Sequence, residues 1–278
     1  MPNDPVIVTL LTDFGLRDAY VGVVKGVILS RAPAARLVDL THHIEQGDIA
    51  AAGYLLSTAW PFFPVGSVHL TVVDPGVGSG RRILAANVAG HHFIAPDNGL
   101  LSEVFDQHEP QHVVSIENDS LSLKPVSTTF HGRDLLAPAA AAVANGMALD
   151  SLGPAVTSWF HLPRLSPDTH PDGSLTGQVI YIDRFGNLIT NITARDLDPF
   201  DPDHLHIHLP GRAIRSLSPS YASVRPGEAL ALIGSSQRLE ISVNRGDAAA
   251  ELRATVGLAV QVRPAQHAAS PTPGEKSP

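Results

Sequence analysis

The stretch VHLTVVDPGVGSGRR, residues 68–82, begins as a strand and ends as a polar, glycine-rich loop. Apolar and β-branched residues predict a strand over residues 68–74. Asp74 places a carboxylate at its tip, where burial demands a partner or water, and Arg81 is the nearest cation in sequence. We expect the two side chains to pair and to position and polarise a water molecule. A purely structural ion pair is the alternative.

The glycines of this loop do not form a known phosphate-binding pattern. Gly76, Gly78 and Gly80 match neither G-x-G-x-x-G nor the Walker sequence with its lysine. Residues 83–88 continue as a strand, whereas a phosphate loop opens a helix. We therefore interpret the glycines as a flexible connection between two strands.

Strands alternate with helices through the first half of the chain. Strands are predicted at residues 6–12, 36–41, 68–74, 83–88 and 112–116. Helical faces are predicted from Val21, Val24 and Ile28, from Ile49, Gly53, Leu56 and Trp60, and over residues 132–146. This alternation favours an α/β domain over residues 1–163, with a mostly parallel sheet flanked by helices.

The pattern changes in the second half. Residues 164–174 are rich in Pro, Asp and Ser and predict a linker. Short strands separated by turns, including one over residues 251–262, predict a smaller all-β domain over residues 175–263. Residues 264–278 contain four prolines and predict a disordered tail.

Composition excludes several classes of protein. The chain has no cysteine, which excludes disulfides, thiolate zinc sites and cysteine nucleophiles. Its net charge is −8 and its basic residues are scattered, so no nucleic-acid partner is expected. No signal peptide and no membrane-spanning run are recognised, so we expect a cytoplasmic protein without a membrane partner.

Polar clusters follow the first three predicted strands, and a fourth precedes the alanine-rich helix. Ligands of open α/β sheets collect at the carboxyl ends of strands, so this convergence suggests an active site. Candidate residues include Asp13, Asp18 and His131. Turn and helix-capping roles remain the alternatives for the aspartates, and a helix N-terminal position for His131. For His42 and His43 we favour a solvated loop.

The second half carries candidates of its own. The stretch IDRFGNLITNI places Asp183, Phe185 and Asn187 around one turn. Turn chemistry explains Asn187, but we do not expect it to explain Asp183 or the adjacent aromatic residue. Ser235 and Ser236 precede a further strand, where a plain turn is favoured.

Taken together, these stretches resemble a known family. TDFGLRD, VDLTHHIEQGDI, FFPVGSVHLTVVDPGVGS, APDNGLL, TFHGRDLLAPAAA, IDRFGNLITNI and SSQRLEISVN are similar to motifs of the S-adenosylmethionine hydroxide adenosyltransferases. These are adenosine-forming S-adenosylmethionine hydrolases, related to the bacterial fluorinase and chlorinase. The resemblance runs in order from about residue 6 to about residue 263.

The resemblance implies an α/β domain followed by a β domain. It also implies a homotrimer, with sites between the N-terminal domain of one subunit and the C-terminal domain of its neighbour. It further implies that S-adenosylmethionine is bound by Asp13 at the ribose, Asp18 and Asp183 at the methionine end, Phe185, Asn187 and the backbone near Val243 at the adenine, and Ser236 at the methionine carboxylate, with Glu240 as a weaker candidate.

The hydrolases of this family carry an Asp-Arg-His set, which Asp74, Arg81 and His131 match. The halogenases have Tyr where this chain has Asp74, and the fluorinase has Ser at the position of Gly132. We therefore expect hydrolysis to adenosine and methionine, by water attack at the ribose C5′, with no cofactor and no metal. Arg81 would polarise the water, Asp74 would orient Arg81, and either Asp74 or His131 would be the base.

Two alternatives belong to other classes. One is a metal-dependent hydrolase of a nucleotide-like substrate, with ligands among Asp13, His42, His43, Asp74, His91, His92 and His131, although no ligand motif fixes a site. The other is a non-catalytic protein that binds adenosine or S-adenosylmethionine and needs no Asp-Arg-His set.

Overall fold

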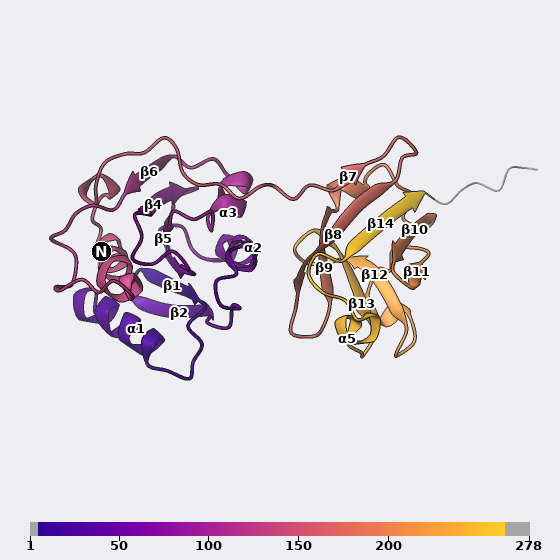
Figure 1. The fold of residues 1–278 in the computed structure, drawn as a ribbon, viewed down its shortest axis with the longest axis horizontal. Helices are drawn as coiled ribbons and strands as arrows, with labels where there is room; N and C mark the ends of the chain where they lie inside the picture. The colour runs from indigo at the N-terminus through magenta and orange to yellow at the C-terminus, as the bar shows by residue number, and fades with distance from the viewer. Residues whose placement is uncertain (1–4, 265–278) are drawn as a thin grey trace, which may run out of the picture. The chain divides into compact units, whose positions relative to one another are not determined.

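The computed structural model describes residues 5–264 of the chain (Figure 1). The chain divides into two compact units after Pro163, so that the described parts are residues 5–163 in unit 1 and 164–264 in unit 2. Within the described range, no helix combines the length and the apolar character that crossing a bilayer requires.

Unit 1 is built on a six-stranded sheet in the order β2-β1-β3-β5-β4-β6. The strands are β1 (Ile7–Thr12), β2 (Arg36–Thr41), β3 (Val68–Val72), β4 (Ile83–Val88), β5 (His91–Pro96) and β6 (His112–Ser115). The helices are α1 (Tyr20–Arg31), α2 (Ile49–Ala59), α3 (Ser102–Gln107) and α4 (Ala137–Ala144). The predicted strands and helices of this half are confirmed, while β5 and α3 were not predicted.

The sheet of unit 1 is mixed, which corrects the expectation of a mostly parallel sheet. β1 pairs in parallel with β2 and β3, and β3 pairs in parallel with β5. β4 runs antiparallel to both β5 and β6, because a tight turn at Ala89 and Gly90 joins it to β5. The C-terminal ends of β1, β2 and β3 nevertheless meet at one edge of the sheet.

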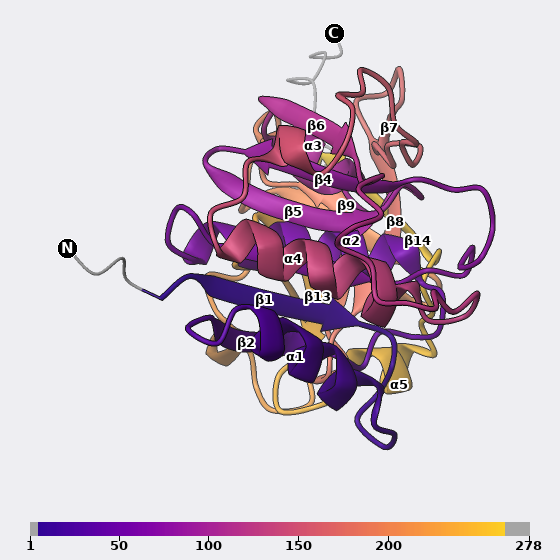
Figure 2. The ribbon, with the colours of Figure 1, turned by 90° about the vertical axis from the view of Figure 1, so that its left-hand side faces the viewer.

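Helices cover both faces of this sheet because successive strand residues point to opposite sides. Leu10 of β1 packs in one buried cluster with Ile28 of α1 and with the alanines of α4. The next residue, Leu11, packs in a second cluster with Leu56 of α2 and Val104 of α3. Figure 2 shows α1 and α4 on the near face of the sheet.

The predicted helix over residues 132–146 is present, but its first turn is wider than an α-helix. Residues Gly132–Leu136 form a π-helical turn that continues directly into α4. Pro138 cannot donate to the Asp134 carbonyl four residues earlier, and that carbonyl accepts a hydrogen bond from the Leu123 N–H (2.9 Å) instead. The Gly146 N–H closes the helix on the Val143 carbonyl.

Three histidines, two of which were considered as metal ligands, pack in the sheet of unit 1, with His69 and His91 buried and His92 half-buried. His69 of β3 contacts the Thr9 hydroxyl through Nδ1 (2.8 Å) and His91 Nδ1 through Nε2 (3.2 Å). Burial, followed by the neighbouring His91 and His92, lowers the pKa of His69 to about 3. Burial also lowers the pKa values of His91 and His92. The three rings therefore form part of the interior as neutral groups.

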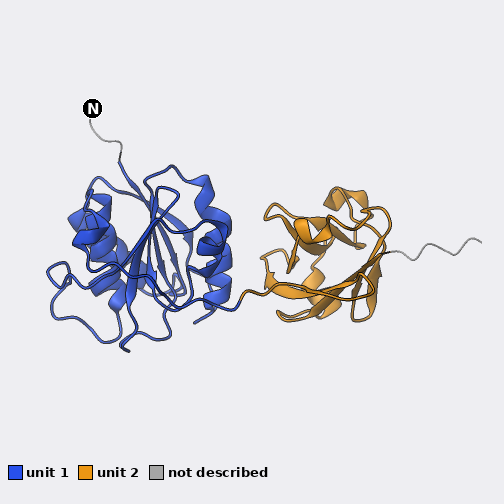
Figure 3. Cartoon of the chain, turned by 90° about the horizontal axis from the view of Figure 1, so that it is seen from above, with its two compact units in different colours: residues 1–163 blue, residues 164–278 orange. Residues whose placement is uncertain are grey.

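Unit 2 (orange in Figure 3) is a mostly antiparallel sheet. Its strands lie in the order β11-β10-β14-β8-β9-β13-β12, with β7 paired to β8. The elements are β7 (Asp168–Thr169), β8 (Leu175–Ile182), β9 (Leu188–Thr193), β10 (Leu205–Leu209), β11 (Arg212–Ile214), β12 (Ala229–Ile233), β13 (Arg238–Val243), α5 (Ala248–Leu252) and β14 (Ala259–Pro264).

Several expectations for this half need correction. Unit 2 is a β unit, as predicted, but it also contains the short helix α5, which starts where Asp247 accepts a hydrogen bond from the Ala250 N–H. The strand expected over residues 251–262 begins only at Ala259. The segment predicted as a linker contains β7. Of the predicted tail, Pro264 ends β14, and residues 265–278 lie outside the described residues.

We predict that unit 1 loses stability on acidification because of His69. Its pKa in the folded protein, about 3, lies below the value of 6.5 for an ordinary histidine. Between these two pH values the unfolded chain binds a proton at His69 and the folded protein does not. The stability of the folded state is therefore fully retained, as far as His69 is concerned, above pH ~6.5 and falls as the pH is lowered towards 3. Between these values, His69 alone should lower the free energy of unfolding by about 1.4 kcal/mol per pH unit.

Urea unfolding followed by tryptophan fluorescence measures this effect, because Trp60 and Trp159 are the two tryptophans and both lie in unit 1. His69→Asn removes the titrating ring and should flatten the pH dependence. Leu70→Ala, at the next position of β3, is the matched control. It should cost ~2–5 kcal/mol at every pH without changing the slope. A His69→Asn slope equal to wild type would contradict the assignment.

Candidate active site

A cavity of about 870 Å³ lies at the edge of the unit 1 sheet where β1, β2 and β3 end. Its walls come from the loops after these strands and from residues 127–133, which lead into α4. Ligand pockets for small molecules usually measure about 300–1,000 Å³. The cavity is therefore large enough for a nucleoside with a substituent.

Asp74, Arg81 and His131 form one chain of contacts at this cavity. Arg81 donates Nε–H to Asp74 Oδ1 (2.6 Å) and Nη2–H to Oδ2, a bidentate pair in which the side chains are 5% (Asp74) and 9% (Arg81) exposed. Nη2 also lies 3.2 Å from His131 Nδ1. Asp74 and His131 line the cavity, whereas Arg81 is not among its lining residues and contacts both of them.

The guanidinium fixes the state of the imidazole. Since an arginine only donates hydrogen bonds, His131 Nδ1 accepts and the ring carries its proton on Nε2. Burial and then the positive charge of Arg81 lower the pKa of His131, and they outweigh the opposite effect of Asp74 and Asp134. His131 is therefore neutral at pH 7 and offers an N–H donor through Nε2.

Gly78 explains how the loop after β3 reaches His131. Its φ is +79°, and a Cβ atom at this position would lie 2.4 Å from the Thr128 carbonyl oxygen. Only glycine allows this approach of two backbones. The loop turns back through a hydrogen bond from the Val77 N–H to the Asp74 carbonyl (3.1 Å). The glycines therefore bring Arg81 against the segment that ends in His131.

The lining of the cavity also includes a second carboxylate and an aromatic wall. Asp13 lines the cavity, and its Oδ2 accepts a hydrogen bond from the Gly47 N–H (2.9 Å). Phe14, Tyr20 and Phe130 also line it, with ring centroids 5.1–6.0 Å apart. None of these three rings was predicted from the sequence, although Phe14 and Phe130 are the neighbours of the predicted Asp13 and His131.

Of two further predicted residues, Gly132 lines this cavity and Asp18 does not. Gly132 lines it, and a Cβ atom there would lie 3.3 Å from the Phe14 ring and 3.4 Å from Val72, so a side chain would crowd the wall. Asp18 is exposed and lines a smaller cavity that shares Tyr20. It does not cap α1, whose N-cap is Ala19 without a side-chain bond.

In unit 2, three predicted residues share the turn between β8 and β9. Asp183 Oδ1 accepts hydrogen bonds from the N–H groups of Phe185 (2.8 Å) and Asn187 (2.9 Å), and Oδ2 accepts one from the Asn187 side chain (2.9 Å). The expectation that turn chemistry leaves Asp183 unexplained is therefore wrong. The turn leaves the Phe185 ring 74% exposed.

The remaining unit 2 candidates are spread along β13. Val243 packs in the core at the end next to the Asp183 turn, while Ser236 lies in the turn before the other end. Glu240, between them, is buried and accepts hydrogen bonds from the Tyr221 hydroxyl (2.7 Å) and the Ser242 hydroxyl (2.9 Å). Burial and then this Glu240 contact raise the pKa of Tyr221.

Of the residues proposed as alternative metal ligands, Asp13, Asp74 and His131 line the cavity, and His42, His43, His91 and His92 do not. His42 is buried against Thr12, which corrects the expectation that it lies in a solvated loop; only its neighbour His43 is exposed. His91 and His92 belong to the interior. Among residues 5–264, no three His, Cys, Asp or Glu side chains form a group suited to a metal ion.

Comparison with known proteins agrees with this two-unit organisation. Residues 8–153 match the model of the SAM hydroxide adenosyltransferase N-terminal domain, and residues 177–261 match that of the C-terminal domain. The chain is 37% identical to an (R)-S-adenosyl-L-methionine hydrolase of Thermus thermophilus, over 92% of this chain and 98% of the relative. It is 27% identical to a fluorinase of Nocardia brasiliensis, over 92% and 96%.

A crystal structure of an uncharacterized conserved protein from Thermotoga maritima has the same fold. It superposes with a TM-score of 0.87 at 34% identity, over 92% of this chain and 99% of that protein. Both domain models match in order and together span most of the chain. The chain belongs to the SAM hydroxide adenosyltransferase family.

Proposed function

We propose that this chain hydrolyses S-adenosyl-L-methionine to adenosine and L-methionine. The observation that carries the proposal is the contact chain of Asp74, Arg81 and His131 beside a cavity large enough for a nucleoside. Family membership and the name of the Thermus relative support it. On the strength of that name we extend the proposal to the (R) epimer at sulfur as the substrate.

The proposed reaction is a displacement at the ribose C5′. A water oxygen forms the new bond to C5′ while the C5′–S bond breaks, and its electron pair leaves with sulfur as the neutral thioether of methionine. The water gives up one proton, and its oxygen becomes the 5′-hydroxyl of adenosine. Holding the water in line behind C5′ supplies an orientation effect that can reach about 7–11 kcal/mol.

We assign the roles at the water as follows. Asp74 accepts a hydrogen bond from the water and then takes its proton, because each carboxylate oxygen bonded to Arg81 keeps a second lone pair, whereas the single lone pair of His131 Nδ1 is occupied by Arg81. His131 holds the water through Nε2–H. Arg81 acts as a positioning residue that fixes the orientation of both side chains and polarises the site.

The substrate-binding roles rest on the family resemblance. Asp13 binds the ribose hydroxyls, and the aromatic wall packs against the nucleoside. We carry over the remaining roles unchanged: Asp18 and Asp183 at the methionine end, Phe185, Asn187 and the backbone near Val243 at the adenine, Ser236 at the methionine carboxylate, and Glu240 as a weaker candidate. A homotrimer with sites between subunits, and a cytoplasmic location without nucleic-acid or membrane partners, are further proposals that rest on the same resemblance and on the sequence.

Replacing the acid or the imidazole should slow chemistry without abolishing binding. Asp74→Asn and His131→Ala should each lower kcat by ~10²–10⁴-fold, the usual contribution of a positioned acid or base. The Kd for adenosine, measured by calorimetry, should stay within about threefold of wild type, because these groups address the water. An equal loss of adenosine affinity would argue for a binding role.

Unit 1 offers a matched control for this pair. Arg82, the residue after Arg81, forms a second ion pair with Asp97, in which Arg82 Nε–H donates to Asp97 Oδ2 (2.8 Å). Neither residue lines the cavity. Asp97→Asn should lower the free energy of unfolding and leave kcat near wild type. A comparable loss of kcat there would mean that Asp74→Asn reports only on loop stability.

The position of water attack is tested directly with isotope. Incubation with S-adenosyl-L-methionine in H₂¹⁸O should place one ¹⁸O atom in the adenosine 5′-hydroxyl and none in methionine, as read by mass spectrometry. Turnover should persist in EDTA. No turnover together with adenosine binding would instead favour a non-catalytic binding protein, and recovery only with added metal would favour the metal-dependent alternative.

We also predict that halide cannot replace water at this site. Asp74 stands where the halogenases carry tyrosine, and Gly132 where the fluorinase carries serine; a side chain at Gly132 would crowd Phe14 and Val72. Reactions supplemented with chloride or fluoride should yield adenosine and no 5′-halo-adenosine. Detection of the halogenated nucleoside by mass spectrometry would overturn the assignment to the hydrolases.

A further inference from the structure

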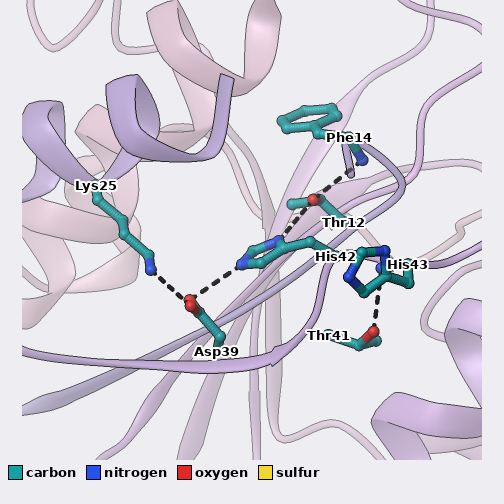
Figure 4. Close-up of polar contacts among 7 residues, drawn as sticks. All are labelled: Thr12, Phe14, Lys25, Asp39, Thr41, His42 and His43. Atoms are coloured by element: carbon teal, nitrogen blue, oxygen red, sulfur yellow. Dashed lines mark hydrogen bonds and ion pairs between the residues drawn. The ribbon is translucent and has the colours of Figure 1, made fainter. Parts of the chain in front are cut away.

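A chain of polar contacts, partly exposed at Lys25 and Asp39 and buried at His42 and Thr12, joins the loop that carries Asp13 to β2 and α1. His42, the first residue after β2, contacts the hydroxyl of Thr12, the last residue of β1, through Nδ1 (2.8 Å). Its Nε2 lies 3.0 Å from Asp39 Oδ1, and Lys25 Nζ donates to Asp39 Oδ2 (2.6 Å). Figure 4 shows these side chains in one row from α1 to β1. Thr12 and His42 are each 2% exposed.

The contacts of this row are consistent with one direction of donation. Burial would raise the pKa of Asp39, but Lys25 and His42 outweigh it and lower that pKa, so the carboxylate is anionic. An anionic Asp39 beside Nε2 favours the tautomer with its proton on Nε2. Nδ1 then accepts from the Thr12 hydroxyl, whose oxygen accepts in turn from the Phe14 N–H (3.3 Å).

His42 therefore holds the loop after β1 at two points. Through its ring it fixes Thr12 and, through that hydroxyl, the Phe14 N–H. Through its backbone carbonyl it accepts the Gly15 N–H (2.8 Å). Asp13 and Phe14, the two residues between these points, both line the cavity.

The order Asp39, His42, Thr12 resembles that of a hydrolytic triad, but its placement does not suit a nucleophile. Thr12 is buried and is not among the residues that line the cavity. Its oxygen is occupied by the His42 ring and the Phe14 N–H. The arrangement is suited to fixing a backbone.

We propose that His42 is a positioning residue for substrate binding, which sets the place of Asp13 and Phe14 at the nucleoside end of the cavity. The proposal rests on the proposed function, since it assumes that Asp13 binds the ribose. A positioning role of this kind should change the affinity for the nucleoside more than the rate of the chemical step.

The test compares His42→Ala with His42→Asn and with His43→Ala. The alanine should raise the Kd for adenosine and the KM for S-adenosyl-L-methionine about tenfold, with kcat within about threefold of wild type. Asparagine can place an amide oxygen near the position of Nδ1 to accept from Thr12, and should restore the Kd to within about threefold. His43 is exposed, so its replacement should leave both constants unchanged.

A double-mutant cycle separates positioning from general destabilisation. In an Asp13→Ala background, His42→Ala should raise the adenosine Kd by clearly less than the roughly tenfold expected in the wild-type background, because one of the two residues that it positions is gone. Additive losses would overturn the proposal, as would a wild-type Kd in His42→Ala. Should His42→Ala fail to fold, Thr12→Val removes the same contact and carries the same expectations.

Amide hydrogen exchange keeps this proposal distinct from the proposed function. His42→Ala should speed exchange at the Phe14 amide, which depends on the His42 ring through the Thr12 hydroxyl, more than at the Gly15 amide, whose acceptor is the backbone carbonyl that alanine retains. If the wild-type protein neither binds adenosine nor turns over S-adenosyl-L-methionine, the proposed function fails, whatever the exchange shows. If it does both, and neither exchange nor affinity changes in His42→Ala, the positioning role alone fails.

Discussion

The bidentate ion pair between Asp74 and Arg81 is the contact on which the geometry of the site depends. Both side chains are nearly buried, and burying two charges is favourable only when their geometry is good and their remaining hydrogen-bonding groups are used. The planar guanidinium meets both conditions, because it pairs with both carboxylate oxygens and still reaches His131 Nδ1. The Asp74–Arg81 ion pair can therefore stabilise the loop and serve the proposed reaction at the same time.

The parallel strands β1, β2 and β3 position the other residues that line the cavity. They end at one edge, so loops that are distant in sequence meet there without long excursions. The His42 contacts join two of these loops from behind, and Gly78 lets the third approach the segment before α4. The loops around the cavity are thus fixed by contacts of residues that do not line it, so the lining side chains remain available to a ligand.

Features that depend on local pattern could be predicted from the sequence, whereas features that depend on topology could not. Asp74 and Arg81 were paired correctly, because a short loop joins them and a carboxylate at a strand end needs a cation. β5 was missed because a tight turn joins it directly to β4, and no helix separates the two strands. His42 was judged solvated because its burial comes from Thr12 on the adjacent strand, which local sequence does not reveal.

In unit 2, the turns could be predicted from local sequence, whereas the bonding of Asp183 and the helix α5 could not. The turn residues Gly186 and Asn187 follow from turn chemistry, and Asp183 proved to belong to it as well. Helix α5 was not predicted because it is only five residues long, although its Asp247 cap and its run of three alanines favour a helix. The family resemblance supplied roles for these residues, but the way in which a turn uses Asp183 required the structure.

The chemistry of the proposed substrate explains why so few groups suffice at the water. A sulfonium carries its positive charge on the leaving atom, so the C5′–S bond breaks to a neutral thioether and needs no acid on that side. The demand falls on the nucleophile, since neutral water attacks carbon poorly and a hydrated anion gives up its shell at a cost. An acceptor, a donor and a cation that fixes both satisfy that demand, and Asp74, His131 and Arg81 have these three properties in one connected set.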